Sequence, residues 1–113
     1  MQLYNYNAEL VKVVDGDTIK VKIDLGFHIV WQTNARLYGI NADELKSDDP
    51  TLKESAQAAK VYLESLMKPG DKLLLKSKAL DKYKRPIAHV FTKDGLCVNE
   101  LLVSNGHANP YMI

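Results

Sequence analysis

The sequence predicts a small α+β domain, mostly β, in which five short strands close into a barrel. One helix is inserted after the third strand, and a short helix lies near the C-terminal end. Three observations predict this fold: an alternating apolar and polar stretch at 19–25 behind an Asp-Gly turn, helically spaced apolar residues at 52–66, and two further strand-like stretches after Pro69-Gly70. With 113 residues, 46% of them hydrophobic and 26% charged, we expect one globular domain over residues 1–113.

The first three strands follow from alternation and turn signals. Apolar residues at 10–14 lead into Asp15-Gly16, and the odd positions of 19–25 are then apolar while the even ones are polar. This pattern predicts a hairpin whose odd positions face the core. A second turn at 24–26 precedes a third strand over 27–38, which is rich in β-branched and aromatic residues.

The inserted helix follows an acidic, exposed loop at 41–50. Thr51-Leu52-Lys53-Glu54 matches a capping box, which predicts Thr51 as the N-cap. Apolar residues then recur at spacings of four and three, as on one face of a helix. They are Leu52, Ala56, Ala59, Leu63 and Leu66.

The last three elements complete the barrel. Residues 72–78 and 87–91 are predicted strands that flank a basic turn at 80–85, and 98–105 is predicted as a helix that Gly106 ends in a left-handed conformation. Short antiparallel strands need closure or a covering helix to protect their edges. The order of elements is therefore typical of a closed barrel of the oligonucleotide-binding type (OB-fold).

Composition excludes several classes of protein. The single cysteine, Cys97, can form neither an intramolecular disulfide nor a cysteine-based zinc site. The longest uncharged stretch, 25–35, is about half a membrane span, and the N-terminus lacks the pattern of a secretion signal. We therefore expect a cytoplasmic protein with no membrane partner.

Charge is distributed unevenly along the chain. Residues 1–67 carry a net charge of −3 and residues 68–113 a net charge of +4. A solvated lysine-rich face explains this asymmetry, and so does a phosphate-binding side next to a metal-binding side.

Arg36 and Arg85 are candidates for phosphate chemistry. Arg36 lies near the end of the third predicted strand, eight residues before Glu44, and Arg85 lies in the basic turn. Phosphodiester hydrolysis needs bidentate groups that neutralise the phosphate, a cation site lined by oxygen atoms, and a carboxylate near the attacking water. A lone arginine is as readily a surface ion-pair partner, so the spacing by itself leaves both interpretations open.

Four ordered stretches resemble the staphylococcal nuclease (thermonuclease) family. They are Val-Val-Asp-Gly-Asp-Thr at 13–18, Arg-Leu-Tyr-Gly-Ile-Asn-Ala-Asp-Glu at 36–44, Asp-Lys-Tyr-Lys-Arg-Pro at 81–86 and Val-Asn-Glu-Leu-Leu-Val at 98–103. The resemblance implies an OB-fold barrel that uses Ca²⁺ to hydrolyse phosphodiester bonds of DNA or RNA, single-stranded or frayed.

The resemblance also implies roles for individual residues. Two oxygen ligands and a backbone carbonyl would bind Ca²⁺, two arginines would hold the phosphate, a carboxylate would orient or activate water, and two residues of the basic turn would contact a terminal phosphate. These residues are Asp17, Asn41 and the carbonyl of Ala42 for the metal, Arg36, Arg85 and Glu44 for catalysis, and Lys82 and Tyr83 for the substrate.

Asn41 departs from the family pattern, which usually has Asp at this position and Pro where this chain has Asp43. We expect weaker Ca²⁺ binding, partly compensated by the Asp43 carboxylate. A non-catalytic nucleic-acid-binding barrel and, with less support, a protein-interaction module are the alternatives. The sequence ends soon after Gly106, where the family's best-known member continues into another helix, so an oligomer or a less covered barrel is also open.

Overall fold

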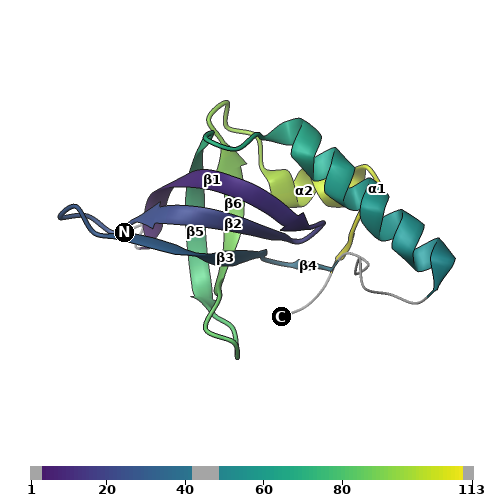
Figure 1. The fold of residues 1–113 in the computed structure, drawn as a ribbon, viewed down its shortest axis with the longest axis horizontal. Helices are drawn as coiled ribbons and strands as arrows, with labels where there is room; N and C mark the ends of the chain where they lie inside the picture. The colour runs from purple at the N-terminus through teal and green to yellow at the C-terminus, as the bar shows by residue number, and fades with distance from the viewer. Residues whose placement is uncertain (1–3, 42–48, 111–113) are drawn as a thin grey trace.

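The barrel closes in the strand order β1-β2-β3-β6-β5, with β5 paired back to β1. A computed structural model describes residues 4–41 and 49–110 (Figure 1). All barrel neighbours are antiparallel except β3 and β6, which are parallel. The predicted five-stranded barrel with two helices is therefore confirmed. Its elements are β1 Asn5–Asp15, β2 Thr18–Asp24, β3 Val30–Leu37, α1 Pro50–Leu66, β5 Lys72–Leu80, β6 Pro86–Thr92 and α2 Val98–Ser104.

A second, two-stranded sheet lies beside the barrel. β4 (Ile40–Asn41) pairs antiparallel with β7 (Asn109–Pro110), so the last described residues return to the segment that follows β3. The sequence pattern did not predict this sheet, because two-residue strands carry no alternation. The pairing matters for the site because it places Asn41 in regular backbone.

The core is formed by the inward faces of the strands, by one face of α1 and by the buried side chains of α2. Ile19, Val21 and Ile23 are at most 3% exposed, which confirms that the odd positions of β2 face inward. On α1, Ala56, Ala59 and Leu63 are buried, whereas Leu52 is 44% exposed and lies outside the packed face. Neither described helix combines the length and the apolar character that a membrane crossing requires.

The N-cap of α1 is Asp49, so the predicted Thr51 cap is wrong. The Asp49 carboxylate accepts hydrogen bonds from the backbone N–H groups of Thr51 and Leu52, at 2.8 and 3.4 Å. Pro50 occupies the first helical turn, where its fixed φ suits the helix and its missing N–H costs nothing. An Asp before a Pro is thus a better start signal than the capping box two residues later.

The third strand begins at Val30 rather than at residue 27. Phe27 and His28 follow Gly26 with φ values of 56° and 63°, and the Leu25 N–H donates to the Ile29 carbonyl. Left-handed backbone cannot continue a strand. The apolar residues here therefore form a protruding loop, in which Phe27 is 96% exposed.

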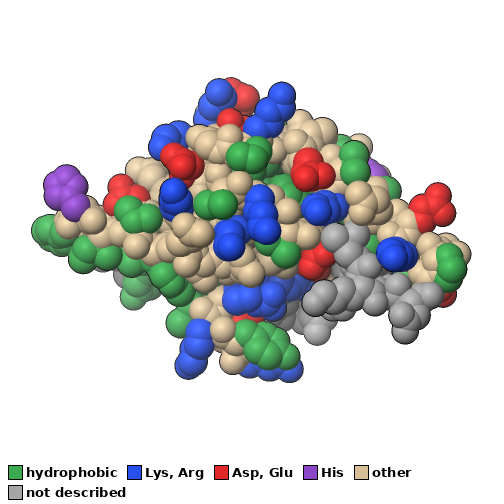
Figure 2. Space-filling view, in the orientation of Figure 1, with side chains coloured by type: hydrophobic (Ala, Val, Ile, Leu, Met, Phe, Trp, Pro, Cys, Tyr) green, Lys and Arg blue, Asp and Glu red, His purple; other side chains and the backbone are tan. Residues whose placement is uncertain are grey.

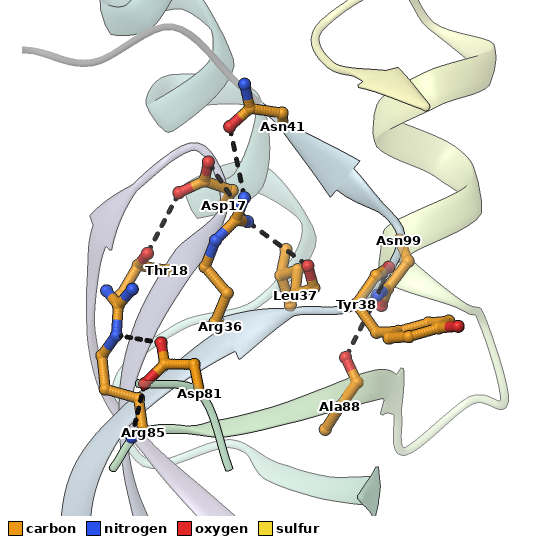
Figure 3. A network of polar contacts seen from close by, with 10 residues as sticks. All are labelled: Asp17, Thr18, Arg36, Leu37, Tyr38, Asn41, Asp81, Arg85, Ala88 and Asn99. Atoms are coloured by element: carbon orange, nitrogen blue, oxygen red, sulfur yellow. Dashed lines mark hydrogen bonds and ion pairs between the residues drawn. The ribbon is translucent and has the colours of Figure 1, made fainter. Parts of the chain in front are cut away.

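Asn99, on α2, fastens the parallel strands together. Its side chain is 3% exposed; Nδ2 donates to the carbonyls of Tyr38 and Ala88, and Oδ1 accepts from the Val90 N–H. These hydrogen bonds join the end of β3 to β6 (Figure 3).

Asn99→Ala is expected to lower the free energy of unfolding by about 3 kcal/mol, because buried backbone groups lose their partners. Urea denaturation followed by circular dichroism measures this loss. Glu100→Ala, an exposed substitution on the same helix, serves as the control and should cost less than about 1 kcal/mol. Equal losses for the two variants would contradict the fastening role.

Candidate functional site

Arg36 is the centre of the first half of the site. Its Nη1 lies 3.3 Å from the Asp17 Oδ2 atom and its Nη2 donates to the Asn41 Oδ1 atom at 3.2 Å (Figure 3). Nη1 also donates to the Leu37 carbonyl at 3.3 Å. The two side chains predicted as metal ligands therefore both lie at this guanidinium group.

Backbone pairing fixes Asp17 beside Arg36. Asp17 lies in the two-residue connection between Asp15 and Thr18, which pair in register, and Thr18 pairs with Arg36 on β3. The Leu37 N–H donates to the Asp17 carbonyl at 2.9 Å, and the Thr18 hydroxyl donates to the Asp17 carboxylate at 3.0 Å. The β1–β2 turn thus positions Asp17 in the site.

The ion pair between Arg36 and Asp17 is shielded from water. Their side chains are 14% and 13% exposed. An ion pair with so little exposure is held in one geometry and is screened less by salt than a surface pair. The guanidinium group is therefore preorganised rather than mobile.

The oxygen atoms of Asp17 and Asn41 at the Arg36 guanidinium group are of the chemical type that a hard cation binds. The Asp17 carboxylate and the Asn41 amide carbonyl are oxygen ligands of the type that Ca²⁺ takes, and water or substrate would complete the usual six to eight. Together, the Asp17 carboxylate and the Asn41 amide carry one negative charge, and both lie against the positive charge of Arg36. Within 4–41 and 49–110, no three His, Cys, Asp or Glu side chains gather into a metal-binding group.

Asp81 organises the second half of the site, the turn that carries Arg85. Its Oδ1 accepts from the backbone N–H groups of Tyr83 and Arg85 at 2.8 and 2.9 Å, and its Oδ2 accepts from the Arg85 Nε at 2.7 Å. Lys84 adopts a left-handed φ of 64°, which lets the chain reverse. One carboxylate therefore holds both the backbone and the side chain of Arg85.

The pKa of Asp81 lies below its ordinary value of 3.8. Partial burial raises the pKa, but the hydrogen bonds from Arg85 and from the Tyr83 N–H, together with the charge of Arg85, outweigh burial. The folded state therefore binds the Asp81 proton less readily than the unfolded chain does.

Asp81→Asn is expected to lower the free energy of unfolding by about 1 kcal/mol at neutral pH, because a charge-assisted hydrogen bond is lost. A carboxylate whose pKa is depressed stabilises the fold above its unfolded value, and this contribution disappears as the pH falls through the folded value. The difference between the wild-type protein and the variant should therefore shrink below about pH 4. Urea denaturation at several pH values tests this; a difference that persists unchanged at pH 2 would contradict it.

The parallel pairing of β3 and β6 brings the two arginines to the same part of the barrel. Arg36 pairs with Ile87, which lies two residues after Arg85. Figure 3 shows both ion pairs in one view of this region. In the described part of the chain, the Nη groups of Arg85 donate no hydrogen bond, so its planar fork is available to an anion.

Lys82 and Tyr83, the predicted substrate contacts, lie at the exposed tip of the turn. The Lys82 Nζ lies 5.1 Å from the centroid of the Tyr83 ring, and the Arg85 Cζ lies 5.5 Å from it. Tyr83 is 67% exposed. The turn therefore presents three cations, Lys82, Lys84 and the partly exposed Arg85, together with one aromatic ring.

Some predicted site residues lie outside the described part of the chain. They are Ala42 and Glu44, together with Asp43. Their roles stay predictions from the sequence.

Two positioning residues were missed by sequence reasoning. Asp81 and Asn99 both belong to stretches that resemble the family, but neither received a role. Asp81 could have been found, because an Asp four residues before an Arg across a turn is typical of a side chain that caps the turn. Asn99 carried no comparable signal, because its partners lie on distant strands.

Comparisons with known proteins show the family to which the chain is similar. A family model described as "Staphylococcal nuclease homologue" matches residues 34–113. Endonuclease YhcR of Bacillus subtilis (strain 168) is 36% identical over 115 residues, an alignment that covers 96% of this chain and 9% of that protein. The chain therefore spans about a tenth of the length of this relative, whose name describes an endonuclease.

Proposed function

Because the chain belongs to the staphylococcal nuclease homologue family, we propose that it hydrolyses phosphodiester bonds of DNA or RNA with the help of Ca²⁺. The observation that carries this proposal is the placement of Arg36 and Arg85 in the same part of the barrel, where Arg36 pairs with Ile87, two residues after Arg85. Each guanidinium group is held by a carboxylate, so both are positioned before a substrate arrives. Family membership supports a nuclease in general, and the geometry supports the specific roles.

The two arginines would neutralise one phosphate. Attack of water on a phosphodiester adds negative charge to the phosphate oxygens, and fixed guanidinium groups stabilise that charge more in the transition state than in the ground state. A planar fork can donate two parallel hydrogen bonds, which a lysine cannot do. Glu44 would orient the attacking water or accept its proton.

Asp17 and Asn41 would hold the cation, together with the carbonyl of Ala42. A bound Ca²⁺ supplies positive charge and open coordination positions for phosphate and water. The protein's own part is to place two oxygen ligands at the guanidinium group of Arg36. Because one of these ligands is an uncharged amide, we propose that Ca²⁺ binds weakly.

Asn41→Asp is expected to tighten Ca²⁺ binding about tenfold, because the added carboxylate attracts the cation more strongly than an amide does. Calorimetric titration with CaCl₂ measures the change. Asn5→Asp makes the same chemical change at the exposed start of β1, at the opposite end of that strand from the Asp15–Thr18 connection, and should leave the affinity unchanged. Equal effects of the two substitutions would show that net charge, rather than the site, sets the affinity.

The proposal is tested by incubating labelled single-stranded DNA and RNA with the protein in saturating CaCl₂ or in EDTA. We expect cleavage with Ca²⁺ and intact substrate with EDTA. Binding in a gel-shift assay that weakens with salt, without cleavage under either condition, would support the non-catalytic nucleic-acid-binding module instead. The absence of both cleavage and binding would overturn both interpretations.

A further inference from the structure

One end of the barrel is an open cavity of about 280 Å³. The described residues that line it lie on the strands or their connections, except for Tyr4, which directly precedes β1, and none belongs to α1 or α2. Figure 1 shows both helices on the opposite side of the barrel from the protruding β2–β3 loop. Among the lining residues are Tyr4, Tyr6, Trp31, Lys78, Leu80 and Pro86.

Aromatic rings occupy inward-facing positions at this end. Residues two apart in a strand point to the same face, so Trp31 shares the inward face of β3 with the buried Ala35 and Leu37. Tyr6 likewise shares the inward face of β1 with the buried Ala8. Trp31 is nevertheless 37% exposed, so the packed core ends before it. The rings therefore line the opening of the cavity, which we call the mouth of the barrel.

The cavity adjoins the turn that carries Arg85. Leu80 and Pro86 line the cavity and directly flank the turn from Asp81 to Arg85. Lys78 is the one charged residue among the described lining residues, and its Nζ lies 5.5 Å from the centroid of the Tyr38 ring, which does not line the cavity. The cavity lining is therefore mainly apolar, and the positive charge near it comes from the adjoining turn. Figure 2 shows Lys and Arg side chains around the lower protrusion of the molecule, where Figure 1 places the β5–β6 turn, as well as over the rest of this face.

We propose that this mouth binds a nucleobase of the substrate strand, a role that rests on the proposed function. Bases stack on aromatic side chains largely irrespective of sequence, while basic groups follow the phosphates. The cavity is close to the lower end of the size range of small-ligand sites, so it suits one flat ring system. A duplex keeps its bases stacked on each other, so the mouth selects single strands.

The separation between Trp31 and Arg36 sets the length of nucleic-acid strand that can contact both residues. Trp31 and Arg36 lie five residues apart on β3, which corresponds to about 17 Å. A phosphate at Arg36 and a base at Trp31 therefore belong to nucleotides that are several positions apart. We expect oligonucleotides, rather than mononucleotides, to occupy both places.

Trp31 is the protein's single tryptophan, so its fluorescence reports on the mouth directly. The probes are an oligothymidylate of about eight nucleotides and an abasic oligomer of the same length. Each probe is added to the wild-type protein in EDTA and to the Glu44→Gln variant in CaCl₂. We expect the oligothymidylate to quench the fluorescence and the abasic oligomer to leave it unchanged. Equal responses to the two oligomers would overturn the base-binding role.

Variants provide a second readout, the affinity for labelled oligothymidylate measured by fluorescence anisotropy. Trp31→Ala should weaken binding about tenfold, and Trp31→Phe should restore most of it. Val61→Ala, which shortens a 53% exposed side chain on α1, is the control and should bind like the wild-type protein. Unchanged affinity in a folded Trp31→Ala variant that still cleaves DNA or RNA would overturn the base subsite alone, whereas a wild-type protein that neither binds nor cleaves would overturn the proposed function as well.

Discussion

Arg36→Ala is expected to lower kcat at least a hundredfold while Ca²⁺ binding becomes tighter. The rate falls because a preorganised donor to the phosphate is lost. The affinity rises because the guanidinium group lies 3.3 Å from the Asp17 carboxylate and 3.2 Å from the Asn41 amide oxygen, where its charge repels a cation. Cleavage kinetics at saturating Ca²⁺ and calorimetric titration measure the two effects separately.

Arg36→Lys is the matched control for charge. It keeps the positive charge beside Asp17 but removes the planar fork, so kcat should stay low while Ca²⁺ binding remains close to that of the wild-type protein. If Arg36→Ala weakened Ca²⁺ binding instead, Arg36 would be acting as a scaffold for the cation ligands. That result would contradict the division of roles proposed for the site.

Arg85→Ala is expected to lower kcat about a hundredfold to a thousandfold without unfolding the protein. The Arg85 side chain is 32% exposed and is held by Asp81 through Nε, so its removal costs little packing and mainly removes the planar fork that we propose binds the phosphate. Single-turnover cleavage of labelled single-stranded DNA, together with circular dichroism, measures rate and folding.

Two further variants distinguish the effect of the Arg85 side chain from that of positive charge in general. Lys93→Ala removes one exposed positive charge from the β6–α2 connection and should leave the rate within about twofold of the wild-type protein, because distant surface charges are largely screened. Asp81→Asn keeps the guanidinium group but loosens it, so its rate should lie between those of the wild-type protein and Arg85→Ala. A folded Arg85→Ala variant with the wild-type rate would remove Arg85 from the mechanism.

Most of the barrel could be predicted from the sequence because its signals are local. The alternation at 19–25 places the inward face of β2 correctly, and Gly106 ends α2 with a φ of 78°. The errors occurred where two local signals competed. Pro50 makes Asp49 the N-cap in place of Thr51, and the left-handed backbone after Gly26 delays the third strand to Val30.

The geometry of the site was less predictable, because it depends on contacts between residues that are distant in the sequence. The parallel pairing of Arg36 with Ile87 joins segments about fifty residues apart, and alternation carries no information about which strands pair. The resemblance to the nuclease family supplied the names of the residues. It did not show that Arg36 would contact both proposed cation ligands, or that Asp81 would hold Arg85.

The first experiment for a Ca²⁺-dependent nuclease is the cleavage rate of labelled single-stranded DNA and RNA over a CaCl₂ series, from micromolar to tens of millimolar. The wild-type protein and the Glu44→Gln variant are compared, with EDTA as the zero point. We expect a rate that rises with Ca²⁺, saturates only at high concentration because of Asn41, and disappears in the variant. A wild-type rate that is independent of Ca²⁺, or equal in the Glu44→Gln variant, would contradict it.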